Sequence, residues 1–252
     1  MGKTTTTVNL GAALAKAGKR VILIDADIGL RNLDLVLGLE KRIVFDLVEV
    51  AEGRCQLRQA LIRDKRFPSL SLLPASQTRD KDSVSEEQFA SLVDQAAQAS
   101  DYVLVDSPAG IEGGFRNAIA GATEAIVVTT PEVSAIRDAD RIVGKLSDKA
   151  LPIRLIVNRL RPEMVHTGDM LSVEDVCEVL AIELLGVIPD DEEIIDTTNR
   201  GEPIVLDETK RLGAIYNKIV RRLEGEIVPF TSFGNGYRQG LFGRIFAGLK
   251  AG

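Results

Sequence analysis

The chain has 252 residues, of which 45% are hydrophobic, so it is long enough to bury a sizeable core within one α/β domain. Its formal net charge of -6 argues against sequence-independent nucleic-acid binding, which depends on neutralising phosphates with Lys and Arg. Cys55 and Cys177 lack C-x-x-C spacing, so they indicate neither a metal site nor a redox pair, and we expect both to be buried apolar fillers. No signal peptide or apolar run of about 18 residues is evident, which predicts a cytoplasmic protein.

Short runs rich in β-branched residues and leucine alternate with helical patterns along the chain. This order is typical of a parallel sheet covered by helices on both faces. The expected strands are 21–25, 70–73, 102–106, 125–129, 153–157 and 184–188. The expected helices are 5–17, 85–99, a helix that begins at the capping-box pattern of 172–175, and 207–223. We therefore predict an α/β fold with a doubly wound, mostly parallel sheet flanked by helices.

The segment Gly2-Lys3-Thr4-Thr5 matches the second half of a phosphate-binding loop and opens the first expected helix. Gly2 would let the backbone approach a nucleotide, and Lys3 would reach the β and γ phosphates. Thr4 would offer its hydroxyl to Mg²⁺. The front glycines of the loop and the strand that leads into it are absent from this sequence, so we expect a form truncated within the loop.

Two of the expected strands end in aspartates. Strand 21–25 ends in Asp25, and Asp27 follows two positions later, so the two side chains would point the same way if the chain stayed extended. One would hold the hydration shell of Mg²⁺ and the other would position the attacking water; the alternative is that both cap the following turn. Strand 102–106 ends in Asp106 before a glycine-containing turn, which is typical of a Walker B strand and its switch loop. Asp106 would bind Mg²⁺ through water.

In this order, the three elements resemble the deviant Walker A family of dimeric ATPases, and more closely the MinD family of septum-site-determining ATPases. The segments 2–11, 25–34 and 131–141 carry the resemblance, which spans nearly the whole chain. It implies ATP and Mg²⁺ as cofactors. The implied roles are catalysis by Lys3 and Asp27, metal binding by Thr4, Asp25 and Asp106, and nucleotide binding by Gly2, Lys3, Thr4, Thr5, Asn158, Arg159, Pro189 and Asp190. For the last four, which match adenine-binding loops, ordinary strand-end turns are the alternative.

The resemblance also implies an ATP-dependent homodimer with MinC-like and MinE-like partners and without a specific nucleic-acid partner. It places the protein on the inner face of the cell membrane, or at the equivalent position in a plastid. The family's loop carries a signature lysine that crosses the dimer interface, and its first strand is central in the sheet; this sequence has neither. We therefore expect unpaired backbone or abnormal pairing in the two neighbouring strands, lower stability than an N-terminally extended form and poor ATP hydrolysis.

The end of the chain predicts a membrane-targeting helix at 238–252, joined by a flexible linker at 226–237 to the ATPase domain at 1–225. Five apolar residues would form one helical stripe, and two basic residues lie outside it. These are Leu241, Phe242, Ile245, Phe246 and Leu249, with Arg244 and Lys250. The pattern suits an interfacial helix on an anionic bilayer, and the alternative is a terminal helix that packs on the domain.

Together these features predict a dimerising, membrane-associated ATPase that positions the cell or plastid division site. It would recruit a division inhibitor and be released when hydrolysis is stimulated. A ParA-type DNA partition ATPase would need a basic dimer surface, and an Fe–S carrier of the same fold would need ligand cysteines. A folded but inactive fragment is the remaining, non-enzymatic alternative.

Overall fold

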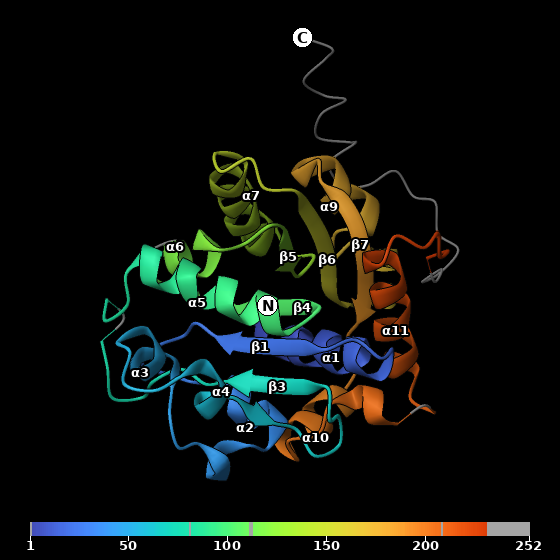
Figure 1. Cartoon of the computed structure of the whole chain (residues 1–252). Helices are drawn as coiled ribbons and strands as arrows, with labels where there is room; N and C mark the ends of the chain where they lie inside the picture. Colours follow the sequence, from blue (N-terminus) through green and yellow to red (C-terminus); the bar gives the residue numbers. More distant parts are fainter. Residues whose placement is uncertain (1, 81, 111–112, 208, 231–252) are drawn as a thin grey trace. The chain divides into compact units, whose positions relative to one another are not determined.

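The computed structural model describes residues 2–80, 82–110, 113–207 and 209–230 (Figure 1). The described chain divides into two compact units. The larger unit contains Lys3–Thr123 and Glu192–Val220. The smaller unit contains Gly2, Glu124–Asp191 and the described residues from Arg221 onward.

A four-stranded sheet forms the centre of the larger unit, in the order β2-β3-β1-β4. Its strands are β1 (Val21–Asp25), β2 (Ile62–Arg63), β3 (Leu70–Leu73) and β4 (Tyr102–Asp106). β1 pairs in parallel with β3 and β4, whereas β2 runs antiparallel to β3. The register places Asp25 opposite Asp106, so two carboxylates meet at the carboxyl end of this sheet.

Helices pack against both faces of this sheet. The larger unit contains the helices α1 (Lys3–Lys16), α2 (Leu33–Leu37), α3 (Leu47–Ala51), α4 (Leu57–Ala60), α5 (Glu86–Ala99), α6 (Gly113–Ala120), α10 (Glu193–Asn199) and most of α11 (Arg211–Leu223), with short 3₁₀ turns η1 (Glu40–Arg42) and η2 (Ile204–Leu206). On one face, Gly11 of α1 lies so close to Leu23 that an added Cβ would come within 2.6 Å of its side chain. On the other face, Ile22 and Ile24 form a core cluster with Phe89 of α5. This alternation follows the two-residue period of a strand.

Local hydrogen bonds explain where several helices begin. Ser85 caps α5 in a capping box with Gln88, and Ser172 caps α9 (Val173–Leu180) in the same way with Asp175. The last core helix, expected from 207, begins at Arg211. Asp207 instead accepts hydrogen bonds from the backbone N–H and the hydroxyl of Thr209, which holds this stretch in a turn.

Three parallel strands form the sheet of the smaller unit, in the order β5-β6-β7. These strands are β5 (Ala125–Thr129), β6 (Ile153–Leu160) and β7 (Glu183–Pro189), with α7 (Val133–Ser147), α8 (Pro162–Thr167) and α9 alongside. β6 is longer than predicted, and its register with β7 is irregular between Val157 and Leu160. Arg159 adopts a left-handed φ of 56° in this irregular stretch.

The predicted α/β fold with a mostly parallel sheet is confirmed, and its strands sort into two hydrogen-bonded sheets. Within the described residues, β4 and β5 each pair with one strand. Tyr102–Val105 of β4 are half-buried, whereas all five residues of β1 are buried. Cys55 and Cys177, expected in the core, are only partly buried.

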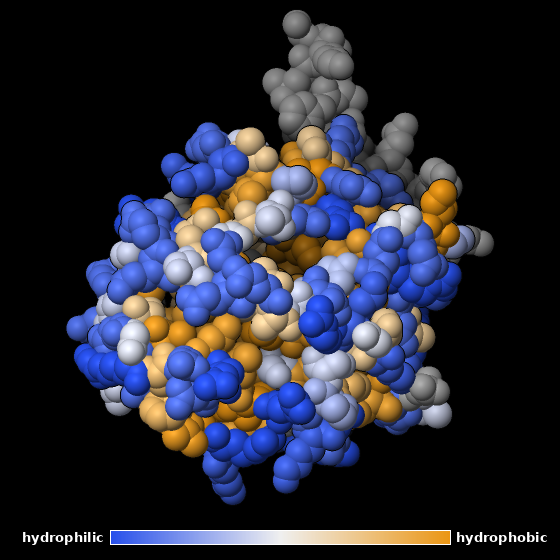
Figure 2. Space-filling model, viewed as in Figure 1, coloured by the Kyte–Doolittle hydropathy of each residue, from blue (hydrophilic) through white to orange (hydrophobic). Residues whose placement is uncertain are grey.

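Polar side chains cover much of the face drawn in Figure 2, with smaller apolar areas between them. No helix among the described residues combines the length and the apolar content needed to cross a bilayer. The predicted membrane segment 238–252, with all of its stripe residues, lies outside the described residues, as does linker segment 231–237.

Candidate nucleotide site

The amino end of α1 carries the residues that the sequence assigns to phosphate binding. Gly2 precedes the helix with a φ of 82°, a conformation that glycine adopts at little cost. Lys3, Thr4 and Thr5 form the first turn, and this turn contains no acidic residue. Because the N–H groups of a first turn lack helical partners and the helix dipole is positive there, this end is suited to an anion such as phosphate.

Asp106 is bound from α1 by two hydroxyl groups. Thr4 Oγ1 donates to Asp106 Oδ2 at 2.6 Å, and Thr7 Oγ1 donates to Asp106 Oδ1 at 3.4 Å. Burial raises the pKa of Asp106 to about 6, and the charge of Asp25 adds to this effect, while the Thr4 hydrogen bond and Lys3 oppose it. Asp106 is therefore a carboxylate whose negative charge is costly until a cation compensates it.

Asp25 is fully buried and organises the loop that follows β1. Its Oδ1 accepts the N–H of Asp27 at 3.0 Å, and its Oδ2 accepts the N–H groups of Asn32 at 2.9 Å and Leu33 at 3.0 Å. Burial raises the pKa of Asp25, and these backbone N–H groups oppose the rise. Asp25 therefore caps the turn after β1, and at the same time it faces Asp106 across the sheet register.

Asp27 lies beyond the end of β1, where Asp25 is the last strand residue, so strand geometry does not set the relative directions of the two side chains. The two carboxylates nevertheless lie near enough for the charge of Asp27 to raise the pKa of Asp25. Asp27 Oδ1 is buried and accepts no hydrogen bond from any described residue. A buried carboxylate oxygen without a partner is costly, so this atom is suited to a bound water or ligand.

These residues fit Mg²⁺. A threonine hydroxyl and carboxylates supply oxygen atoms, the donors that Mg²⁺ prefers. Within the described part of the chain, no group of three or more His, Cys, Asp or Glu forms an all-protein metal cluster. A small set of protein oxygens is what Mg²⁺ uses, because the ion keeps several of its waters and also binds substrate phosphates.

The residues predicted to contact the base lie in the smaller unit. Leu160 pairs with Pro189, and the N–H of Asp190 donates to the carbonyl of Leu160 at 3.0 Å, so the carboxyl ends of β6 and β7 lie side by side. The structure thus brings Asn158 and Arg159 to the same sheet edge as Pro189 and Asp190.

Two features near these residues follow from local geometry. Asp190 forms an ion pair with Arg161 at 2.6 Å, which holds the turn after β7 against the end of β6. A Cβ at Gly2 would lie 2.5 Å from the Asn158 amide nitrogen, so a larger residue would require this side chain to shift.

Two contacts were missed from the sequence. Thr7 reaches Asp106 because it lies one helical turn after Thr4, and that three-residue spacing was a usable signal. Arg31 forms an ion pair with the fully buried Asp34 at 2.9 Å while holding a left-handed φ of 49°. Burial raises the pKa of Asp34, and the charge of Arg31 opposes the rise. The sequence gave no sign of this buried pair.

A parallel α/β fold, a phosphate-binding helix start and magnesium-type oxygens at two adjacent strand ends define a P-loop nucleotide-binding ATPase. Residues 1–204 match the family described as the CobQ/CobB/MinD/ParA nucleotide binding domain. The septum site-determining protein MinD of Synechocystis sp. is 57% identical over 235 residues, which cover 92% of this chain and 88% of that protein. For MinD of Bacillus subtilis the identity is 53% over 232 residues, covering 91% and 87%.

Solved structures give the same assignment. The MinC:MinD cell division protein complex of Aquifex aeolicus matches with a TM-score of 0.85 and 50% identity, over 92% of this chain and 95% of that chain. MinD from Pyrococcus horikoshii complexed with Mg-ADP matches with a TM-score of 0.80 and 28% identity, over 88% and 90%. The chain belongs to the MinD family of nucleotide-binding ATPases.

Proposed function

We propose that this chain is an ATP-operated switch that dimerises with ATP bound, attaches to an anionic membrane and positions the division site. The observation that carries the proposal is the contact of Thr4 with Asp106 beside Asp25, in a fold of the MinD family. This arrangement supports a site at which the presence of the γ phosphate changes the loops after β1 and β4.

Each residue of the phosphate part has a separate task. Thr4, Asp25 and Asp106 would hold Mg²⁺, which supplies neutralisation of the charge on the phosphates when it is bound. Lys3 would contact the β and γ phosphates from the first turn of α1, together with Gly2, Thr4 and Thr5. Asp27 would orient the attacking water through Oδ1, the buried oxygen that accepts no hydrogen bond from the described residues.

Asn158, Arg159, Pro189 and Asp190 would bind the adenine. Their position at the ends of two adjacent parallel strands supports this role, because ligands of open α/β sheets bind at the carboxyl ends of strands. The irregular register after Val157 turns the Arg159 backbone away from regular pairing.

Membrane attachment would depend on the segment 238–252. Burying its five apolar side chains, Leu241, Phe242, Ile245, Phe246 and Leu249, would give on the order of 10 kcal/mol as an upper bound. Ordering about ten residues costs ~1 to 2 kcal/mol each, so that a single copy binds only marginally. Two copies in one dimer bind with avidity, and Arg244 and Lys250 add attraction to anionic lipid.

The partners that we propose are a second copy of the chain, a MinC-like inhibitor and a MinE-like activator. Similarity to the MinD protein of the Aquifex aeolicus MinC:MinD complex supports the MinC-like inhibitor as a partner. The activator would stimulate hydrolysis and so release the protein from the membrane. In this scheme the protein acts at the inner face of the cell membrane, or on the equivalent plastid surface, and has no specific nucleic-acid partner.

Vesicle co-sedimentation tests the proposal. The full chain and a form that lacks residues 238–252 are mixed with anionic phospholipid vesicles or DNA, in the presence of ATP or ADP. We expect the full chain to pellet with vesicles more strongly in ATP than in ADP, and the shortened chain to stay in solution. Binding to DNA but not to vesicles would support a ParA-type partition ATPase, and no response to nucleotide would indicate an inactive form.

A further inference from the structure

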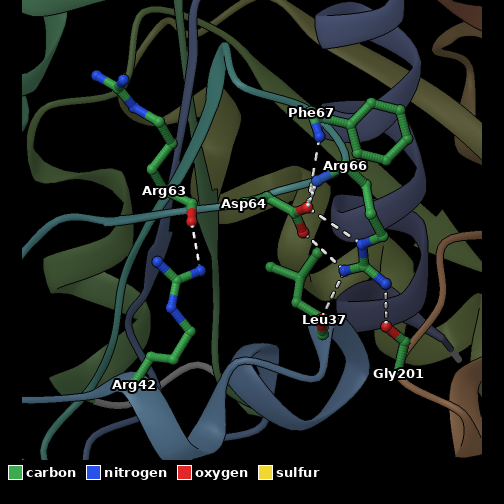
Figure 3. Close-up of polar contacts among 7 residues, drawn as sticks. All are labelled: Leu37, Arg42, Arg63, Asp64, Arg66, Phe67 and Gly201. Carbon is green, nitrogen blue, oxygen red and sulfur yellow. Dashed lines mark hydrogen bonds and ion pairs between the residues drawn. The ribbon is translucent and has the colours of Figure 1, made fainter.

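Arg66 joins three segments of the larger unit that are far apart in sequence (Figure 3). Its Nη2 donates to the carbonyl oxygen of Leu37 at 2.7 Å, at the carboxyl end of α2. Its Nη1 donates to the carbonyl oxygen of Gly201 at 2.6 Å, in the turn between α10 and η2. Asp64 accepts from Arg66 Nε at 3.1 Å and from Nη2 at 2.7 Å. The guanidinium therefore connects the β2–β3 turn with both other segments.

Asp64 fixes the direction in which this guanidinium points. Its side chain is only 1% exposed, and Oδ1 also accepts the backbone N–H of Arg66 at 2.7 Å. Burial raises the pKa of Asp64, but the hydrogen bonds and charge of Arg66 outweigh burial, so the pKa lies below its ordinary value. A planar fork is needed to reach Asp64, Leu37 and Gly201 together, and a lysine ammonium lacks it.

The segments that Arg66 joins also touch through their backbones. A Cβ at Gly201 would lie 2.6 Å from Gly38 Cα and 2.7 Å from Gly38 N. Gly38 ends α2 with a φ of 63°, and Gly201 has a φ of 66°. Because two backbones meet here with no side chain between them, a small shift of the turn is transmitted to the end of α2.

The opposite end of α2 is held by the candidate metal residue. Asp25 Oδ2 accepts the N–H groups of Asn32 and Leu33, at the start of this five-residue helix. A helix of this length spans about 7.5 Å at 1.5 Å per residue, so a displacement at one end reaches the other. α2 is thus fixed by Asp25 at its amino end and by Arg66 at its carboxyl end.

Hydrogen bonds also join the segment after the Gly201 turn to the phosphate-binding helix α1. Asn9 of α1 accepts the N–H of Ile204 at 2.7 Å, and Lys16 Nζ donates to the carbonyl of Val205 at 3.2 Å. α1 therefore holds the Gly201 turn in place independently of Arg66, and Arg66 connects this fixed turn to the end of α2.

We propose that Arg66 is a positioning residue for the magnesium site: by holding the end of α2 against the Gly201 turn, it keeps the N–H groups of Asn32 and Leu33 on the Asp25 carboxylate. This inference rests on the proposed role of Asp25. Without Arg66, α2 loses its anchor at Leu37, and the Asp25 carboxylate loses donors that fix its orientation. Loss of an orienting partner of a metal ligand typically weakens metal binding about 10- to 100-fold.

The test compares Arg66→Gln and Arg66→Lys with Arg42→Gln in the full chain. Arg42 is a matched control because its Nη1 donates to one carbonyl oxygen, that of Arg63 at 2.7 Å, next to Asp64 in sequence (Figure 3). Binding of a fluorescent ADP analogue is measured against Mg²⁺ concentration and in EDTA. Amide hydrogen exchange at Asn32 and Leu33 is the readout that does not depend on the metal.

We expect both Arg66 variants to need about tenfold more Mg²⁺ for the half-maximal increase in binding of the ADP analogue. Their affinity for the analogue in EDTA should be unchanged. Exchange at Asn32 and Leu33 should be faster in both, and Arg42→Gln should behave as the wild type. An unchanged Mg²⁺ requirement, or an equal loss of affinity with and without Mg²⁺, would overturn the inference. If Asp25→Asn also leaves the Mg²⁺ requirement unchanged, the proposed metal role of Asp25 fails; if only the Arg66 variants do so, the positioning role alone fails.

Discussion

Thr4 donates its hydroxyl hydrogen to Asp106 at 2.6 Å, although 102 positions separate them in sequence. The bond joins the first turn of α1 to the carboxyl end of β4, and it holds a carboxylate whose pKa burial raises to about 6. Asp106 is opposite Asp25 in the strand register. The bond between Thr4 and Asp106 therefore lies at the centre of the candidate phosphate and magnesium site.

Replacing Thr4 with valine should weaken Mg²⁺ binding to the nucleotide complex. Valine keeps the shape of threonine but removes the hydroxyl that we assign to the metal, so we expect a loss of about tenfold or more. Calorimetric titration of the nucleotide complex with Mg²⁺ measures this loss of Mg²⁺ affinity. Thr7→Val is the matched control, because Thr7 lies 3.4 Å from Asp106 and should have a smaller effect. Equal losses in the two variants would contradict the assignment.

Asp106→Asn should stabilise the protein in the absence of Mg²⁺ and nucleotide. Because the folded-state pKa of Asp106 is raised to about 6, the ionised carboxylate opposes folding above that pH. This destabilising effect of the Asp106 charge disappears as the pH falls toward 4. There the carboxyl is protonated in the folded chain and increasingly protonated in the unfolded chain. At pH 7.5 we expect a gain of about 1 to 3 kcal/mol in the free energy of unfolding.

Urea denaturation in EDTA at pH 7.5 and pH 4 checks this expectation. The gain should be present at the higher pH and nearly absent at the lower one. A gain of the same size at both pH values would show that packing, and not the buried charge, causes it.

Asp27→Asn should separate hydrolysis from binding. The substitution removes the charge with which Oδ1 would orient water, so hydrolysis should slow by about 10² to 10⁴. Nucleotide affinity should remain, because Lys3 and Thr4 are intact. Phosphate release under single-turnover conditions, together with binding of a fluorescent ATP analogue, measures both quantities. Wild-type turnover in this variant would exclude Asp27 from catalysis.

Gly201→Ala should destabilise the larger unit more than Gly53→Ala. Both glycines have a left-handed φ, which costs alanine about 1 to 2 kcal/mol. A Cβ at Gly201 also collides with the Gly38 backbone, whereas nothing lies within 4 Å of a Cβ at Gly53. Overpacking should add about 1 to 3 kcal/mol at Gly201, as measured by thermal or urea unfolding. Equal destabilisation would mean that the two backbones separate easily.

The sequence predicted the strands and the residues at their ends because buried β-branched runs and glycine-bounded helices are local signals. Asp25, Asp106 and the start of α1 came from such signals. The two-residue strand β2 and the five-residue helix α2 were not predicted, since elements this short carry almost no periodic pattern.

Other features depend on contacts between distant segments. Arg66, Leu37 and Gly201 meet through tertiary packing, and their spacing in sequence gives no indication of it. The start of the last core helix was misplaced because the Asp207 side chain competes for the backbone there. The buried ion pair between Arg31 and Asp34 was likewise not predicted from the sequence.

The central claim is that ATP occupancy brings two chains together and that the pair holds the membrane. Analytical ultracentrifugation of Asp27→Asn, in which bound ATP should persist, tests this claim most directly. With Mg²⁺ and ATP, we expect a mass twice that of the 27.3 kDa chain, and with Mg²⁺ and ADP the mass of one chain. A single-chain mass with ATP bound, or a double mass in both nucleotides, would contradict the account.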